Sequence, residues 1–130
     1  MLVQPRLPPA VYAAAVGELV KEIAAEIKAP DAEVLRVLKA LARQRAVVEV
    51  ALERFFRKDT VDELALIVVE IARARKDGLF SAALLRDRLD NGRKVAIQIL
   101  EYFDGQGLTL RRGDLRVINP RRLDLSARAS

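Results

Sequence analysis

The sequence predicts a mainly α-helical protein with small β-hairpins, an α+β fold class, built from two tandem modules. The first observation is that one series of elements, helices followed by a short β-hairpin, occurs twice along the 130 residues. The second is the composition: alanine, leucine and valine are abundant, whereas aromatic residues make up 5% of the chain. This composition favours helical packing around an aliphatic core.

The first copy is expected to begin with a helix opened by Pro8-Pro9, because proline is tolerated in a first helical turn. Apolar residues continue this helix at helical spacing up to Pro30: Leu19, Ile23 and Ile27. Asp31 is the expected N-cap of the next helix. Two β-prone runs then predict a hairpin, residues 47–50 and 54–57.

The second copy begins at Thr60, which has the spacing of a capping box with Glu63. We expect its first helix to run to about Lys76 and to end before Gly78. The middle of this helix, residues 64–69, is apolar on more than one face. That pattern predicts a helix buried on several sides, between the two modules.

Two further helices and a hairpin complete the second copy. Ser81 is the expected cap of one helix, and Asn91-Gly92 forms the turn into the other. The apolar face of this last helix is predicted from its spacing: Ala96, Ile99, Leu100 and Phe103. Two apolar runs joined by a Gly-Asp turn then predict the hairpin, residues 108–110 and 115–118.

Helices followed by a hairpin are the order of a winged helix, in which a helix-turn-helix is followed by a β-hairpin called the wing. We therefore expect a first winged helix in residues 1–58 and a second, which binds the ligand, in residues 59–122. A flexible tail is expected at residues 123–130.

Cysteine and histidine are both absent, which excludes disulfides, thiolate or imidazole metal ligands, and Ser-His or Cys-His catalytic pairs. The sequence contains no phosphate-binding loop of the form G-x-x-x-x-G-K-[ST]. We therefore expect no catalytic residues, no cofactor and no metal. No apolar stretch approaches the roughly 18 residues of a membrane span, and prolines interrupt any signal peptide. A cytoplasmic monomer that does not contact a membrane is expected.

The net charge of +5 is concentrated in the C-terminal half. Residues 1–80 carry 13 basic and 12 acidic side chains, whereas residues 81–130 carry 10 and 6. A basic half suggests a polyanionic partner, usually nucleic acid. The alternative is that the charge only keeps the protein soluble.

Two pairs of cations are the candidate binding residues. Arg93 and Lys94 begin the last helix, where the helix dipole and the free N–H groups favour a phosphate. Arg111 and Arg112 lie in the expected turn of the hairpin, and arginine suits both phosphate pairing and stacking on an unpaired base. A weaker hypothesis adds further arginines to this surface: Arg86, Arg88 and Arg116. The alternative in each case is an ordinary solvated charge, paired in part with neighbouring acids.

Other patterns favour a structural role. An outward basic stripe in the first module is interpreted mainly as a solvated face: Arg36, Lys39 and Arg43. Phe55 and Phe56 are expected in the core of the first hairpin rather than on a base-stacking platform.

Residues 80–117 resemble the last winged helix of the bacterial selenocysteine-specific elongation factor. The resemblance lies in RDRL at 86–89, GRKVAI at 92–97, LEYFD at 100–104 and RRGD at 111–114. Upstream, residues 33–57 resemble that family's third winged helix in layout. In that family a GTPase similar to the general tRNA-delivering elongation factor carries selenocysteyl-tRNA.

The resemblance implies that the winged helices bind an mRNA hairpin, the selenocysteine insertion element beside a UGA codon. The last module of that family holds the hairpin loop through phosphate contacts and extruded bases. Arg93 and Lys94 match the helix-start pair, and Arg111 and Arg112 match the hairpin pair, so these four are the expected RNA-binding residues. Contact with the ribosome would be indirect, through the full-length factor. The GTPase and tRNA-binding parts do not occur in this sequence, which is therefore expected to be a fragment or a stand-alone piece.

Asn91-Gly92 departs from the small or hydroxyl residues often found at that position in the family.

Two other functions remain open. One is a DNA-binding transcriptional regulator, although Glu101 on the outer face of the last helix would repel a duplex backbone. The other is a protein-interaction scaffold that uses the apolar run at residues 64–69, in which case that run would be exposed.

Overall fold

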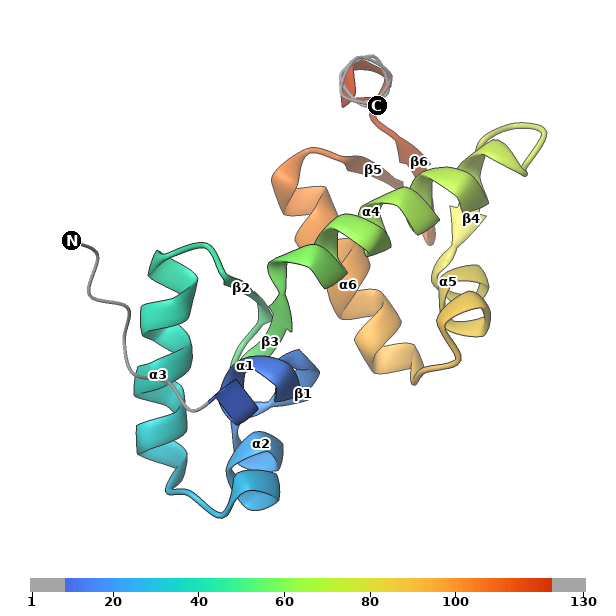
Figure 1. Ribbon diagram of the computed structural model, residues 1–130. Coiled ribbons are helices and arrows are strands. Elements are labelled where there is room, and N and C mark those ends of the chain that lie inside the picture. Colours follow the sequence, from blue (N-terminus) through green and yellow to red (C-terminus); the bar gives the residue numbers. More distant parts are fainter. Residues whose placement is uncertain (1–8, 123–130) are drawn as a thin grey trace. The chain divides into compact units, whose positions relative to one another are not determined.

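The computed structural model describes residues 9–122, and the expected flexible tail at 123–130 lies outside the described residues. The chain divides into two compact units, residues 1–62 and 63–130. Each unit contains helices and one three-stranded antiparallel sheet (Figure 1). The predicted mainly helical α+β class is confirmed, because both units have the order of elements of a winged helix.

The first unit contains six elements: α1 (Pro9–Ala14), β1 (Val16–Leu19), α2 (Val20–Ile27), α3 (Asp31–Arg43), β2 (Val47–Ala51) and β3 (Arg54–Arg57). Its sheet has the order β1-β3-β2. The predicted hairpin corresponds to β2 and β3. Asp31 is the first residue of α3 rather than its cap, since the N-cap position is held by Pro30.

The prediction of a continuous helix from Pro8-Pro9 to Ile27 is wrong, because β1 interrupts it. At Gly17 the pairing of β1 with β3 is irregular, and the backbone there has a φ of 106°. A Cβ at this position would lie 2.8 Å from two atoms of the Phe56 ring. Glycine therefore permits both the left-handed backbone and the close approach of the strand to the ring.

Helices α2 and α3 cover one side of this sheet with aliphatic residues. The side chain of Phe55 is completely buried and that of Phe56 is nearly so, which confirms their predicted place in the core of the hairpin. The rest of this core is mainly aliphatic: Val11, Val20, Ile23, Val34, Val37, Leu38, Leu41 and Val47. The apolar residues of α3 at helical spacing thus form the buried face of that helix.

Helix α4 (Lys58–Arg73) begins directly after β3, and the division between the units lies within it. The predicted start at Thr60 and end near Lys76 are both wrong. An ion pair between Lys58 and Asp62 supports the first turn instead of the expected capping box. The apolar run of α4 is not buried on every side, because Leu66 is 68% exposed.

The second unit continues with five elements: β4 (Phe80–Ser81), α5 (Ala82–Leu89), α6 (Arg93–Gln106), β5 (Thr109–Arg112) and β6 (Leu115–Ile118). Its sheet has the order β4-β6-β5, the same topology as in the first unit. The sequence did not predict β4. Ser81 caps α5 as predicted, since its hydroxyl accepts a hydrogen bond from the Leu84 N–H at 3.4 Å.

The core of the second unit contains the apolar face that was predicted for α6. Buried residues of β4, α5 and β6, and Leu108, complete it. Its members are Phe80, Leu85, Ala96, Ile99, Leu100, Phe103, Leu108 and Ile118. After β6, Asn119 donates hydrogen bonds to the carbonyls of Leu108 and Gly107 at 2.8 and 2.9 Å. These bonds hold the end of β6 against the residues that follow α6.

Candidate nucleic-acid interface

A short connection without a bulky side chain leads from α5 into α6. Asp90 takes the left-handed conformation at the end of α5, and Gly92 occupies the N-cap position of α6. Gly92 offers no side chain to cap the helix, so the N–H groups of the first turn remain suited to an external anion. Arg93 and Lys94 follow at once, and both side chains are exposed.

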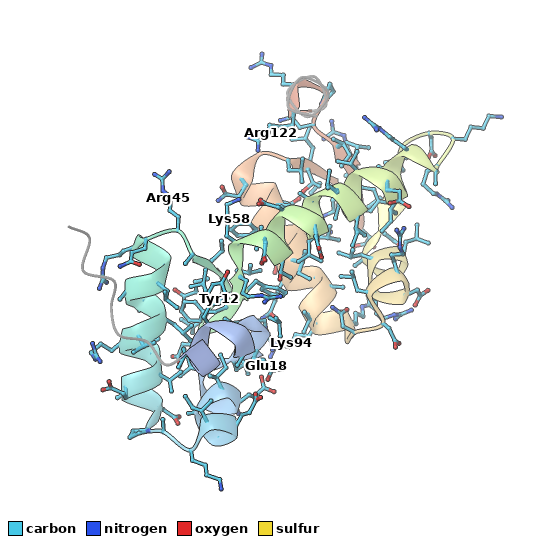
Figure 2. The ribbon with its side chains drawn as sticks, viewed as in Figure 1. Tyr12, Glu18, Arg45, Lys58, Lys94 and Arg122 are labelled. Carbon is cyan, nitrogen blue, oxygen red and sulfur yellow. The ribbon has the colours of Figure 1, made fainter. Side chains whose placement is uncertain are left out.

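One face of α6 turns toward the wing. Arg93, Ile97 and Glu101 are spaced four residues apart, so they lie above one another on the helix surface. Lys94 and Gln98, also four residues apart, lie on the neighbouring part of the helix surface (Lys94 is labelled in Figure 2). The side chain of Gln98 is partly buried, and its Oε1 atom is fully covered.

The wing, formed by β5 and β6, directs Arg111 and Arg112 away from each other. Arg111 and Arg112 were expected in the turn, but both belong to β5. Successive residues of a strand point to opposite faces, so the two side chains diverge. The Nε atom of Arg111 donates a hydrogen bond to the Gly113 carbonyl at 2.8 Å, which holds this side chain over the turn.

A hollow of about 340 Å³ lies between the start of α6 and the wing, and we call it the helix–wing hollow. Arg93 of α6 and Arg111 of β5 both line it. Ile97 and Leu115 give it apolar walls, and the remaining lining residues are Ser81, Ala82, Ala83, Glu101, Asp114 and Arg116. The hollow therefore offers cations beside apolar surface, a combination that accommodates a phosphate next to an unpaired base.

The four predicted site residues thus divide into two pairs. Arg93 and Arg111 come together at the helix–wing hollow, whereas Lys94 and Arg112 are exposed outside its lining. In the part of the chain that the structure describes, none of the four forms an ion pair with a carboxylate. Their charge therefore remains available to an anionic ligand.

The three arginines of the weaker hypothesis all have carboxylate partners. Arg86 pairs with Asp87 at 3.0 Å, and Arg88 pairs with Glu70 at 2.9 Å. Arg116 is only 4% exposed, and its ion pair to Asp104 is described further below. The expectation that some of these charges are paired with neighbouring acids is therefore confirmed.

The basic stripe on α3 of the first unit is outward-facing, as predicted, and two of its cations are paired. Arg36 bonds to Glu33, and this guanidinium lowers the pKa of the Glu33 carboxyl through the hydrogen bond and its charge. Lys39 pairs with Glu49 of β2 at 2.6 Å. Arg43 is exposed. Two of the three cations on this face of α3 are therefore paired with carboxylates, whereas Arg93 and Arg111 at the helix–wing hollow are not.

Residues 9–122 are the part of the chain that the structure describes. Within these residues, no three His, Cys, Asp or Glu side chains are grouped in a way that could hold a metal ion. None of the helices described there combines the length and the apolar character that crossing a membrane requires.

The fold and the helix–wing hollow define a tandem winged-helix protein in which a helix start and a wing present unpaired cations side by side. Among solved structures, the mRNA-binding domain of elongation factor SelB from E. coli, in complex with SECIS RNA, matches with a TM-score of 0.76 and 32% sequence identity. The match covers 85% of this chain and 95% of that chain. The chain therefore belongs to the SelB family, as one of its winged-helix regions.

The sequence comparisons agree with this assignment. The family model described as "Elongation factor SelB, winged helix" matches residues 72–118. The selenocysteine-specific elongation factor of Escherichia coli is 37% identical over 95 residues, which is 73% of this chain and 15% of that protein. The corresponding factor of Haemophilus influenzae is 35% identical over 66 residues, 51% of this chain and 10% of its own length. The chain thus spans a small part of these relatives.

Proposed function

We propose that this chain is the mRNA-binding region of a selenocysteine-specific elongation factor, and that its second unit binds an RNA hairpin of the SECIS type. The relationship to an E. coli domain solved with SECIS RNA supports the class of ligand. The observation that carries the proposal is the helix–wing hollow, where Arg93 and Arg111 line one concave surface without a carboxylate partner.

The chemistry of this surface fits a hairpin loop better than a regular duplex. Arg93 and Lys94 add their charge to the N-terminus of α6, where phosphates bind favourably. Arg111 reaches the same hollow from the wing, and the apolar side chains of Ile97 and Leu115 can face an unstacked base. Glu101 on the same face limits the length of α6 that can lie against a phosphate backbone.

The wider role follows from the same proposal. The chain would tether its factor to mRNA beside a UGA codon, act as a monomer in the cytoplasm, and contact the ribosome only through the rest of the factor. Its own contribution would be binding rather than catalysis, without cofactor or metal. The proposed modules are residues 1–58 and 59–122, with binding assigned to the second.

The proposal is tested by measuring binding of a SECIS-type hairpin in a gel-shift assay. Arg93→Ala and Lys94→Ala are each expected to abolish the shifted band at concentrations that saturate the unmodified chain, while the thermal unfolding midpoint stays unchanged. The unchanged midpoint is expected because both side chains are exposed and make no ion pair in the described chain.

Lys21→Ala is the matched control, because Lys21 is an exposed cation on α2 of the first unit. It removes the same charge, so a general electrostatic attraction would weaken equally in all three variants. Wild-type affinity in Arg93→Ala and Lys94→Ala would refute the assignment of these residues.

A further inference from the structure

Asp104, near the end of α6, connects this helix to both strands of the wing. Its Oδ1 atom accepts a hydrogen bond from the Thr109 hydroxyl of β5 at 2.6 Å. Its Oδ2 atom accepts two from Arg116 of β6, at 3.0 Å from Nη2 and 3.3 Å from Nε. Thr109 and Arg116 are 1% and 4% exposed, so the donors of this cluster are shielded from water, while the Asp104 side chain is 25% exposed.

The same cluster pairs one of the two wing arginines that share a face of the sheet. Arg111 of β5 is paired in register with Arg116 of β6, so the two side chains share one face of the sheet. Two like charges directly opposite each other repel and would destabilise the hairpin. The carboxylate of Asp104 neutralises Arg116, which leaves Arg111 as the cation that faces the helix–wing hollow.

We propose that Asp104 is a positioning residue for RNA binding: acting through Thr109 and Arg116, it fixes the wing against α6 so that Arg111 and Arg93 line one hollow. This inference rests on the proposed function. Asp104 is not itself among the residues that line the hollow, whereas Arg116 is. The effect of Asp104 on the ligand would therefore be transmitted through the wing.

The proposal makes a prediction opposite in sign to that of simple electrostatics. Removing a carboxylate near a polyanion site should strengthen binding if charge alone mattered. If Asp104 positions the wing, its removal should weaken binding, because Arg111 is no longer held at the hollow and Arg116 becomes a buried, unpaired cation.

The experiment compares Asp104→Asn with Glu101→Gln in the full chain, using a SECIS-type RNA hairpin and fluorescence anisotropy. Both variants remove one negative charge from α6, and Glu101 lines the hollow without a hydrogen-bond partner in the described chain. Asp104→Asn is expected to lower the affinity at least tenfold and to reduce the salt slope by about 1, because one phosphate contact of the wing is lost. Glu101→Gln is expected to leave the affinity unchanged or to raise it.

A second pair of variants separates positioning from folding. Thr109→Val keeps the shape of the side chain but removes the hydroxyl donor, and Thr109→Ser restores that donor. Thr109→Val is expected to weaken binding and reduce the salt slope, while Thr109→Ser recovers most of both. If Asp104→Asn is unfolded at the assay temperature, this pair decides the question, since a purely structural role would not change the salt slope of the folded protein.

Wild-type or tighter binding by folded Asp104→Asn would overturn the positioning role, as would wild-type affinity and salt slope in Thr109→Val. Arg93→Ala, measured in parallel, keeps the two hypotheses apart. If Arg93→Ala loses binding while Asp104→Asn does not, only the positioning role is lost. If the unmodified chain does not bind the hairpin, the proposed function itself is wrong and the positioning role is lost with it.

Discussion

Arg93 and Arg111 differ from several nearby cations in having no ion pair within the described chain. Arg86 and Arg88 are neutralised by exposed partners, and Arg116 by Asp104. An exposed ion pair contributes little to stability, but it reduces the charge that a polyanion encounters. The distribution of ion pairs therefore distinguishes the candidate ligand-binding cations more sharply than the number of basic residues does.

At this scale we predict different salt dependences for paired and unpaired arginines. Arg93→Ala and Arg111→Ala should each lower the slope of log affinity against log salt by about 0.7–0.9, because one counterion-releasing contact is lost. Arg86→Ala should leave the slope unchanged, because Asp87 already neutralises that guanidinium. Hairpin titrations between about 50 and 200 mM salt measure the three slopes. Equal reductions in all three would contradict the distinction.

The sequence predicted the cations of the candidate site but not Asp104, the residue that we propose positions them. Arg93 and Arg111 were predictable because a helix start and a hairpin are local features. Asp104 lies twelve positions before Arg116, and no periodic pattern connects a carboxylate at the end of a helix with an arginine on a later strand. The sequence analysis placed Arg111 and Arg112 in the turn. Their side chains point in opposite directions because the structure includes both residues in β5.

At the scale of elements, the same short strand precedes the helix-turn-helix in both units. β1 and β4 each pair with the second strand of the wing, which becomes the central strand of the sheet, and neither was predicted from the sequence. A strand of two to four residues carries too little alternation to be recognised. Its partner lies more than thirty positions along the chain, as in the pairing of Phe80 with Arg116. The longer helices and the hairpins, which have local signals, were predicted correctly in kind.

Gly17 provides the test of β1. Gly17→Ala should destabilise the protein by about 1–3 kcal/mol, because alanine disfavours a φ of 106° and its Cβ would contact the Phe56 ring. Gly105→Ala is the control, since Gly105 is exposed within α6 and a Cβ there meets no atom within 4 Å. It should stabilise by about 0.5–1 kcal/mol. Thermal or urea unfolding gives both values, and similar effects of the two substitutions would argue against the proposed strain at β1.

At the scale of the whole molecule, the excess positive charge lies in the C-terminal half of the sequence, which also contains the residues that line the helix–wing hollow. Two unpaired cations, Arg93 and Lys94, begin α6, and Glu101 lies two turns further along the face of Arg93. A recognition helix that lies along a duplex groove would bring this carboxylate close to phosphates. The arrangement favours contact through the tip of the helix.

We therefore predict that an RNA hairpin of the SECIS type binds at least tenfold more tightly than a DNA duplex of equal length and salt. The physical reason is that a loop can offer both a phosphate and an unstacked base to the hollow, whereas a duplex offers mainly its backbone. A competition titration with labelled hairpin and unlabelled duplex measures the ratio. Displacement by duplex at equal concentration would favour the DNA-binding alternative.

The location of the boundary inside α4 has a consequence for how such a protein can be rearranged. β3 ends at Arg57, α4 begins at Lys58, and the units divide between Asp62 and Glu63. A recombination event or a truncation at that point would sever the i to i−4 hydrogen bonds of a helix rather than a loose connection. Modules joined in this way are expected to be inherited and expressed together, and an engineer who transplants the second one should carry the complete helix with it.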